Sequence, residues 1–101
     1  MELYHVTTDI RKESIRFSGV DPTKATGKMQ ASWWVTEDQV VWAMAHVSAK
    51  WGVSVDHLVI FSCESDDWLF VRWVRPGVFY TVRPIIPDMI WDWKDFVKPE
   101  V

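Results

Sequence analysis

The chain has 101 residues, of which 49% are hydrophobic and 25% charged, and its formal net charge at pH 7 is −3. This length allows one hydrophobic core, so we expect a single domain over residues 1–101. The high apolar content and small net charge exclude disorder for most of the chain. No apolar run approaches the roughly 20 residues that cross a bilayer. The first residues do not show the basic region followed by an apolar region that is typical of a secretory signal. We therefore expect a cytoplasmic protein without a membrane span.

The chain contains one cysteine, Cys63, which excludes an internal disulfide bond and a thiolate-rich zinc site. We expect this residue, near the end of a strand, to be a small buried apolar side chain. The histidines do not form the His-x-x-x-His pair typical of zinc-binding helices; the three are His5, His46 and His57. The sequence therefore predicts no metal site.

The first elements follow from alternation and turn residues. Residues 2–7 alternate and are rich in β-formers, which predicts a strand with His5 on the same face as Leu3. A short helix should follow and end near Gly19, a residue suited to a left-handed C-terminal cap. Residues 20–31 have no periodic pattern, which predicts a surface loop.

The clearest helix start in the sequence follows a short strand expected at residues 32–35. Thr36 and Gln39 have the spacing of a capping box, in which the threonine hydroxyl accepts from the N–H of Gln39. Gly52 should end the helix. The apolar residues expected to face the core recur at helical spacing: Val40, Met44, Val47 and Trp51.

Three further strands are expected at residues 55–63, 68–74 and 78–83. The segment after Pro84 should be extended and should supply a short end strand. The helices are too few and too irregularly placed for a parallel, doubly wound sheet. The sequence therefore predicts an α+β fold with a mostly antiparallel, bent or split sheet and two helices.

Two motifs resemble the ADP-ribosyltransferase-like fold. They are the strand 3–7, which reads Leu-Tyr-His-Val-Thr, and residues 32–37, which read Ser-Trp-Trp-Val-Thr-Glu and open a helix. The similarity is to the histidine-tyrosine-glutamate branch, which includes diphtheria-toxin-like and poly(ADP-ribose) polymerase enzymes and many small bacterial and phage relatives. It implies a sheet around a cleft, binding of NAD, and transfer of ADP-ribose to a protein target.

The resemblance also implies roles for individual residues. His5 would bind the ribose hydroxyls, and the backbone of Val6, followed by Thr7, would hold the nicotinamide amide. Trp34 takes the place of the tyrosine that stacks on the nicotinamide ring, and Trp33 takes that role if the strand register shifts by one residue. Together these groups would hold the donor while its nicotinamide–ribose bond weakens.

The catalytic glutamate of the family has no counterpart at its usual place. When the late strand is aligned, that position falls on residues 75–77, which read Arg-Pro-Gly. Glu64, Asp66 and Asp67 precede this segment and are the candidates to replace it, with Glu64 first. The resemblance therefore implies NAD binding, and ADP-ribosyl transfer if one of these carboxylates reaches the cleft.

A non-catalytic binding module is the alternative function. Residues 68–86 carry Arg72, Arg75 and Arg83 among aromatic residues that include Trp68, Trp73, Phe79 and Tyr80, and they contain no acid. Arginine with exposed aromatic rings is typical of protein hot spots and of base-stacking surfaces, which predicts a protein or a single nucleic-acid strand as partner. Four tryptophans are expected to pack in the core: Trp42, Trp51, Trp68 and Trp73.

Overall fold

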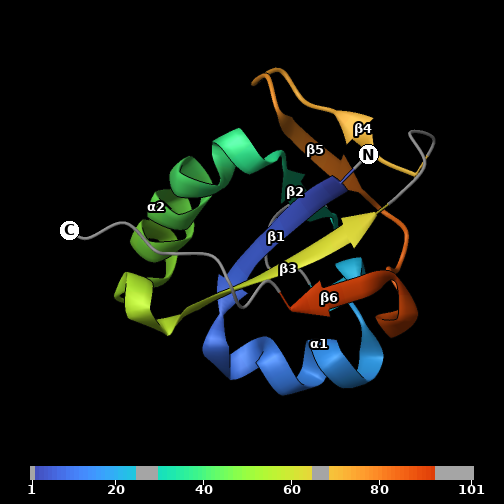
Figure 1. Cartoon of the computed structure of the whole chain (residues 1–101), viewed down its shortest axis with the longest axis horizontal. Coiled ribbons are helices and arrows are strands. Elements are labelled where there is room, and N and C mark those ends of the chain that lie inside the picture. Colours follow the sequence, from blue (N-terminus) through green and yellow to red (C-terminus); the bar gives the residue numbers. More distant parts are fainter. Residues whose placement is uncertain (1, 25–29, 65–68, 93–101) are drawn as a thin grey trace.

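The computed structural model describes residues 2–24, 30–64 and 69–92. Within these residues, six strands form one sheet in the order β4-β5-β2-β1-β3-β6, and every neighbouring pair is antiparallel (Figure 1). The predicted α+β class with an antiparallel sheet and two helices is confirmed. The elements are β1 (Glu2–Thr8), α1 (Lys12–Ser18), β2 (Ser32–Val35), α2 (Val40–Trp51), β3 (Leu58–Glu64), β4 (Val71–Arg72), β5 (Val78–Thr81) and β6 (Ile90–Asp92).

The helices α1 and α2 lie on either side of the sheet (Figure 1). Ile15 of α1 belongs to the apolar cluster that contains Leu3, whereas Met44 of α2 belongs to the cluster that contains Tyr4. Consecutive strand residues point to opposite faces, so β1 supplies buried side chains to both clusters. The alternation expected for residues 2–7 is confirmed.

The segment after α1 is tied to the C-terminal part of the chain. Val20 N–H donates to the Ile85 carbonyl oxygen at 2.8 Å, and Ile85 N–H donates to that of Val20 at 2.9 Å. Gly19 precedes this bridge with φ +78°, and a Cβ built on it would lie 1.9 Å from the Ile85 oxygen. Only glycine fits there, which explains why α1 ends at this residue.

The start of α2 differs from the predicted capping box. The Thr36 hydroxyl donates to the Asp38 carboxylate, and the Gln39 N–H donates to the Thr36 carbonyl oxygen at 2.9 Å. Residues Glu37–Gln39 therefore form a 3-10 turn before α2 begins, and the expected side-chain cap is wrong. The Gln39 side chain instead accepts from Arg75 Nε at 3.1 Å, which a local pattern cannot anticipate.

Three strands are shorter than expected, and the strand expected at 78–83 ends at Thr81. Residues Val55–His57 form a 3-10 turn in which Ser54 Oγ accepts from the Asp56 N–H, so β3 begins at Leu58. The strand expected at 68–74 is reduced to β4 within the described part. The predicted end of α2 at Gly52 is confirmed, with φ +64°. None of the helices in the described ranges is long and apolar enough to span a bilayer.

Candidate functional site

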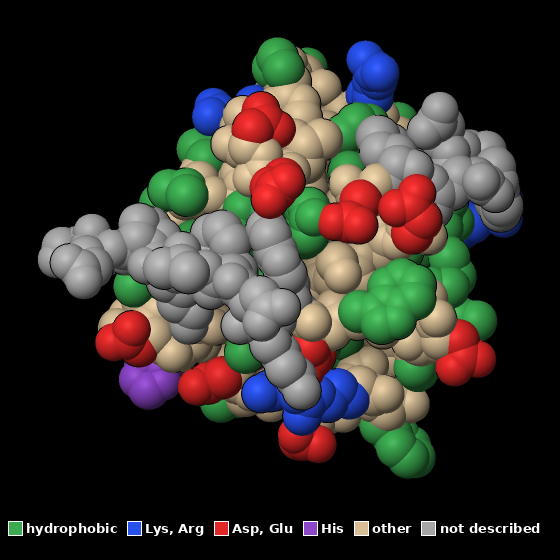
Figure 2. All heavy atoms as spheres, in the orientation of Figure 1, with side chains coloured by type: hydrophobic (Ala, Val, Ile, Leu, Met, Phe, Trp, Pro, Cys, Tyr) green, Lys and Arg blue, Asp and Glu red, His purple; other side chains and the backbone are tan. Residues whose placement is uncertain are grey.

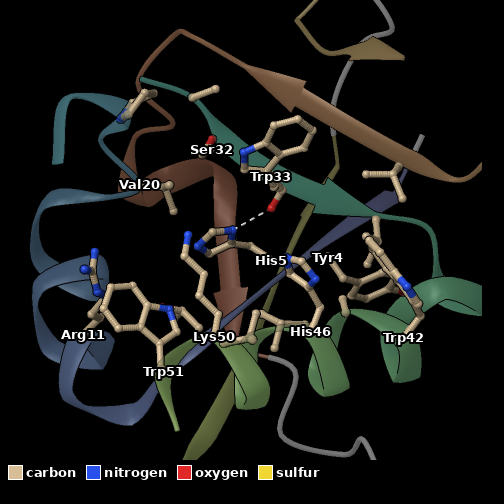
Figure 3. Close-up of a pocket in the computed structure, with 18 of the residues that line it drawn as sticks. Tyr4, His5, Arg11, Val20, Ser32, Trp33, Trp42, His46, Lys50 and Trp51 are labelled. Carbon is tan, nitrogen blue, oxygen red and sulfur yellow. Dashed lines mark hydrogen bonds between the residues drawn. The ribbon is translucent and has the colours of Figure 1, made fainter. Parts of the chain in front are cut away.

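A pocket of about 450 Å³ lies beside the contact between β1 and β2 (Figure 3). β1 pairs with β3 along its whole length, but its register with β2 is a single pair, Tyr4 with Val35. The strands β1 and β2 form one wall, one side of α2 forms another, and residues 20–22 close part of the rim. This volume falls within the usual range for small-molecule sites.

His5 lies in this pocket next to β2. Its Nδ1 is 2.8 Å from the carbonyl oxygen of Trp33. A carbonyl can only accept, so Nδ1 carries the proton and donates, and in the neutral ring Nε2 keeps a lone pair that can accept. Burial lowers the pKa of His5, and the charge of Arg11 lowers it further, against the opposing effect of the bond to Trp33. The ring is therefore neutral at neutral pH and can accept a hydrogen bond from a hydroxyl group.

The two adjacent tryptophans of β2 have different surroundings. Trp34 is 0% exposed, donates from Nε1 to Ser32 Oγ at 2.8 Å, and lies 5.1 Å from the His5 ring centroid. Trp33 is 38% exposed and lines the pocket. Its ring centroid lies 5.4 Å from that of Trp73. Trp34 thus supports His5 from the core, whereas Trp33 offers a ring to the pocket.

Other residues named from the sequence divide between the pocket and the far end of β1. Val6 and Thr7 are buried and line the pocket. Glu64 is exposed at the end of β3 opposite Glu2, and it is not among the lining residues. Asp66 and Asp67 lie outside the described residues. The structure thus brings the histidine and a tryptophan to one cavity and leaves Glu64 outside its wall.

Glu2 and Glu64 are cross-strand partners at the N-terminal end of β1. Several acidic side chains are exposed on the face of the molecule that Figure 2 shows. The Tyr4 hydroxyl donates to Glu2. Burial raises the pKa of Tyr4 above its usual value, and this bond and the negative charges of Glu2, Glu37 and Glu64 raise it further. This end of β1 therefore repels anions.

The pocket contains one carboxylate among its described lining residues, Asp21. Its Oδ1 accepts from the Thr23 N–H at 3.0 Å and from the Thr23 hydroxyl at 2.7 Å, which fixes its orientation. Sequence reasoning missed Asp21 because it lies in the segment expected to be an unpatterned loop. The bridge between Val20 and Ile85 brings that segment to the pocket.

The α2 wall carries residues that the sequence analysis did not assign to a site. Trp42 stacks on His46 with ring centroids 5.4 Å apart, and the Arg75 guanidinium lies 4.3 Å from the Trp42 centroid. One turn further along α2 are Lys50 and Trp51, which line the pocket together with Arg11 from the turn before α1. The signal for this wall was the recurrence of 42, 46 and 50 at helical spacing.

The tryptophans expected in the core do not all lie there. Trp42 is half-buried, whereas Trp51 is 43% and Trp73 is 44% exposed, so the core assignment is wrong for these two. Trp68 lies outside the described residues. Trp51 is on the same face of α2 as the buried Val40 and Met44, but it lies in the last turn of the helix, where it lines the pocket.

Comparison of the chain with protein-family models, with curated protein sequences and with solved structures found no significant match. No group of three or more His, Cys, Asp or Glu side chains in the described ranges could hold a metal ion. Cys63 is 0% exposed, as expected, and burial raises the pKa of its thiol to about 11. The chemistry available in the pocket is therefore that of the neutral His5, a second histidine (His46), a tyrosine, tryptophan rings, two cationic side chains and one carboxylate.

Proposed function

We propose that the pocket binds NAD and that the domain is ADP-ribosyltransferase-like. The observation that carries the proposal is the hydrogen bond from His5 Nδ1 to the Trp33 carbonyl oxygen. Because Nδ1 donates in this bond, Nε2 of the neutral ring is left to accept a hydrogen bond from a hydroxyl group. The ribose of NAD has such hydroxyl groups. The motif that contains His5 and the motif that contains Trp33 line the same pocket, which supports the resemblance on which NAD was expected.

The flat nicotinamide ring has a suitable partner in the same pocket. Trp33 is exposed there and is held by edge contact with Trp73 and by Tyr80, whose ring centroid is also 5.4 Å away. A large ring held in this way stacks on a flat heterocycle at little cost in conformational freedom. We therefore assign the stacking role to Trp33, the alternative to Trp34 in the sequence analysis, because Trp34 has no exposed surface.

Transfer of ADP-ribose to a protein target is the catalytic extension of this proposal. It needs a carboxylate near the ribose as positive charge develops there. The described residue that meets this need by position is Asp21, which lines the pocket. Nicotinamide release from NAD in the presence of the intact protein tests the extension, and Asp21→Asn should remove any release without preventing NAD binding. Release that is unchanged in the Asp21→Asn variant would show that the acid is elsewhere.

Calorimetric titration of the intact chain with NAD tests the binding proposal. The wild-type chain should bind saturably, and His5→Phe should weaken binding by about tenfold or more, because the accepting nitrogen is lost. His57→Phe is the matched control, since His57 is exposed and does not line the pocket. Melting temperatures of both variants show whether they fold. The proposal fails if the wild-type chain does not bind NAD, or if a folded His5→Phe variant binds it equally well.

A second candidate, binding of a single nucleic-acid strand, is favoured by one observation. Trp33, Trp73 and Tyr80 form a connected set of rings, and the first two are exposed. Arg75 adds positive charge at the nearby Trp42. Anisotropy of a labelled single-stranded oligonucleotide should then fall steeply between about 50 and 200 mM salt. Trp73→Ala should weaken this binding and leave NAD binding less affected than His5→Phe does.

A further inference from the structure

One side of the pocket gathers two cations around a tryptophan. Arg11, Lys50 and Trp51 lie together there, and Trp33 and Trp42 lie on the other side (Figure 3). Arg11 comes from the turn before α1, and Lys50 and Trp51 come from the last turn of α2. The fold therefore brings Arg11 to Lys50 and Trp51, which are neighbours in the sequence.

Neither of these two cations forms an ion pair within the described residues, and the one carboxylate in the described lining of the pocket is Asp21. Arg16, in α1, pairs with Asp92 and Glu13, and His57 contacts Asp9 at 3.2 Å. No ion pair joins Arg11 or Lys50 to a carboxylate in the part of the chain that the structure describes. Two such cations in the wall of one pocket favour an anionic ligand.

Trp51 holds both cationic groups at the pocket. The Arg11 guanidinium carbon lies 5.4 Å from the centroid of the Trp51 ring, and Lys50 Nζ lies 5.6 Å from it. Both distances are within the range of cation–π attraction. Contact with one ring places two like charges beside Trp51 on one side of the pocket, where a ligand with two negative charges could pair with both.

Stabilisation of the helix end explains the position of Lys50, but it does not explain why Arg11 lies beside the same tryptophan. A lysine in the last turn of a helix is stabilised by the partial negative charge of the helix end. Arg11 belongs to another element, and its charge reaches the pocket interior, because it contributes to the lowered pKa of His5. The positions of Arg11 and Lys50 in the lining thus point to a shared ligand rather than to helix stability alone.

We propose that Arg11 and Lys50, positioned by Trp51, bind the phosphate groups of the pocket's ligand, so that the pocket selects a nucleotide with a diphosphate over a nucleoside. The inference rests on the proposed function. The ring of the ligand lies at Trp33, its ribose at His5, and its diphosphate at the C-terminal end of α2. The stretch of α2 from Trp42 to Trp51 spans about 14 Å, which is longer than a nucleoside alone.

Binding of three nicotinamide compounds tests the proposal on the intact chain. NAD carries a diphosphate, nicotinamide mononucleotide carries one phosphate, and nicotinamide riboside carries none. Affinity should fall in that order, and only the affinity for the phosphorylated compounds should fall as salt is added. Inorganic pyrophosphate should compete with NAD. Equal affinity for NAD and nicotinamide riboside would overturn the proposal.

Variants separate the cations from the rest of the pocket. Arg11→Gln and Lys50→Gln should each weaken NAD binding by about tenfold and leave nicotinamide riboside binding unchanged. Lys12→Gln is the matched control, because it removes one positive charge next to Arg11 at a residue that does not line the pocket. Trp51→Leu should act like the loss of a cation, whereas Trp51→Phe, which keeps an aromatic face, should restore most of the affinity.

The outcomes distinguish this inference from the proposed function. If NAD binds and depends on His5 but not on Arg11 or Lys50, the phosphate assignment is wrong and the proposed function stands. If ADP or pyrophosphate binds through Arg11 and Lys50 while NAD does not bind, the assignment stands and the proposed function is wrong. If neither NAD nor pyrophosphate binds, both are wrong. Melting temperatures equal to that of the wild-type chain show that the variants are folded.

Discussion

Substitution of Gly19 by alanine should be among the most destabilising small changes in this protein. At φ +78° and ψ −166°, a region that essentially only glycine adopts, an added methyl group makes the backbone conformation unfavourable by roughly 1–3 kcal/mol. It would also lie 1.9 Å from the carbonyl oxygen of Ile85, so the bridge to Val20 must open. Its two hydrogen bonds contribute about 1 kcal/mol each. We expect a total loss of about 3–5 kcal/mol, with displacement of the adjacent Val20 and Asp21 at the pocket.

Gly52→Ala is the matched control for this change. Gly52 has φ +64°, but no atom lies within 4 Å of an added Cβ, so only the conformational cost of about 1–2 kcal/mol applies. Thermal unfolding followed by circular dichroism measures both variants. For a domain of this size, each 1 kcal/mol lowers the melting temperature by roughly 4–8 °C. If Gly19→Ala melts no lower than Gly52→Ala, the close approach of the Ile85 carbonyl does not hold in solution and the reasoning is refuted.

Three other predictions concern His5, Trp34 and Cys63. The pKa of His5 is lowered in the folded state, so the unfolded chain binds the proton first as the pH falls. The free energy of unfolding should therefore decrease below about pH 6.5. Urea titrations should show a smaller decrease for His5→Phe. An unchanged pH dependence in that variant would contradict the assignment. Trp34→Ala should lower the free energy of unfolding by about 3–5 kcal/mol, since the ring is 0% exposed. Trp73→Ala should lower it much less, because Trp73 is 44% exposed. Equal losses of stability in the two variants would contradict the burial of Trp34 in β2. Cys63 should resist a thiol reagent at about pH 8 until the protein unfolds, because its thiol is buried and its pKa is raised to about 11; rapid labelling of the native chain would contradict this.

Local patterns were sufficient for much of the secondary structure. Alternation in residues 2–7 and 32–35 predicted β1 and β2, and Gly19 and Gly52 marked the ends of both helices. These features depend on residues close together in the chain, where the period of two in a strand and the conformational freedom of glycine act directly. Gly52 adopts the expected left-handed conformation, whereas Gly19, with φ +78° and ψ −166°, ends α1 in a different conformation that glycine allows. The predicted capping box did not form, because the Gln39 side chain accepts a hydrogen bond from Arg75, a residue distant in sequence that a local pattern does not include.

The pocket was decided by tertiary structure. Alternation required Trp33 and Trp34 to face opposite ways, but it could not say which ring would be covered, because that depends on the elements that pack on each face. In the fold, Trp34 is buried in the cluster that includes Ile15 of α1, and Trp33 is left at the pocket. The candidate acid Glu64 ends β3, which pairs with β1. Because the strands are antiparallel, Glu64 lies opposite Glu2 at the N-terminal end of β1 and does not line the pocket.

The pairing of Arg11 with Lys50 at the pocket had no signal in the sequence. Arg11 follows the first strand and Lys50 ends the second helix, and no spacing rule connects two residues so far apart. Packing α2 against β1 places the last turn of that helix beside the turn that precedes α1, where Trp51 contacts both charged groups. The sequence by itself determined which residues could carry charge, stack or accept a hydrogen bond. The tertiary structure decided which of them share a cavity. Sharing a cavity depends on contacts between segments that are far apart in the chain, and the distance between such segments in space does not follow from their positions in the sequence.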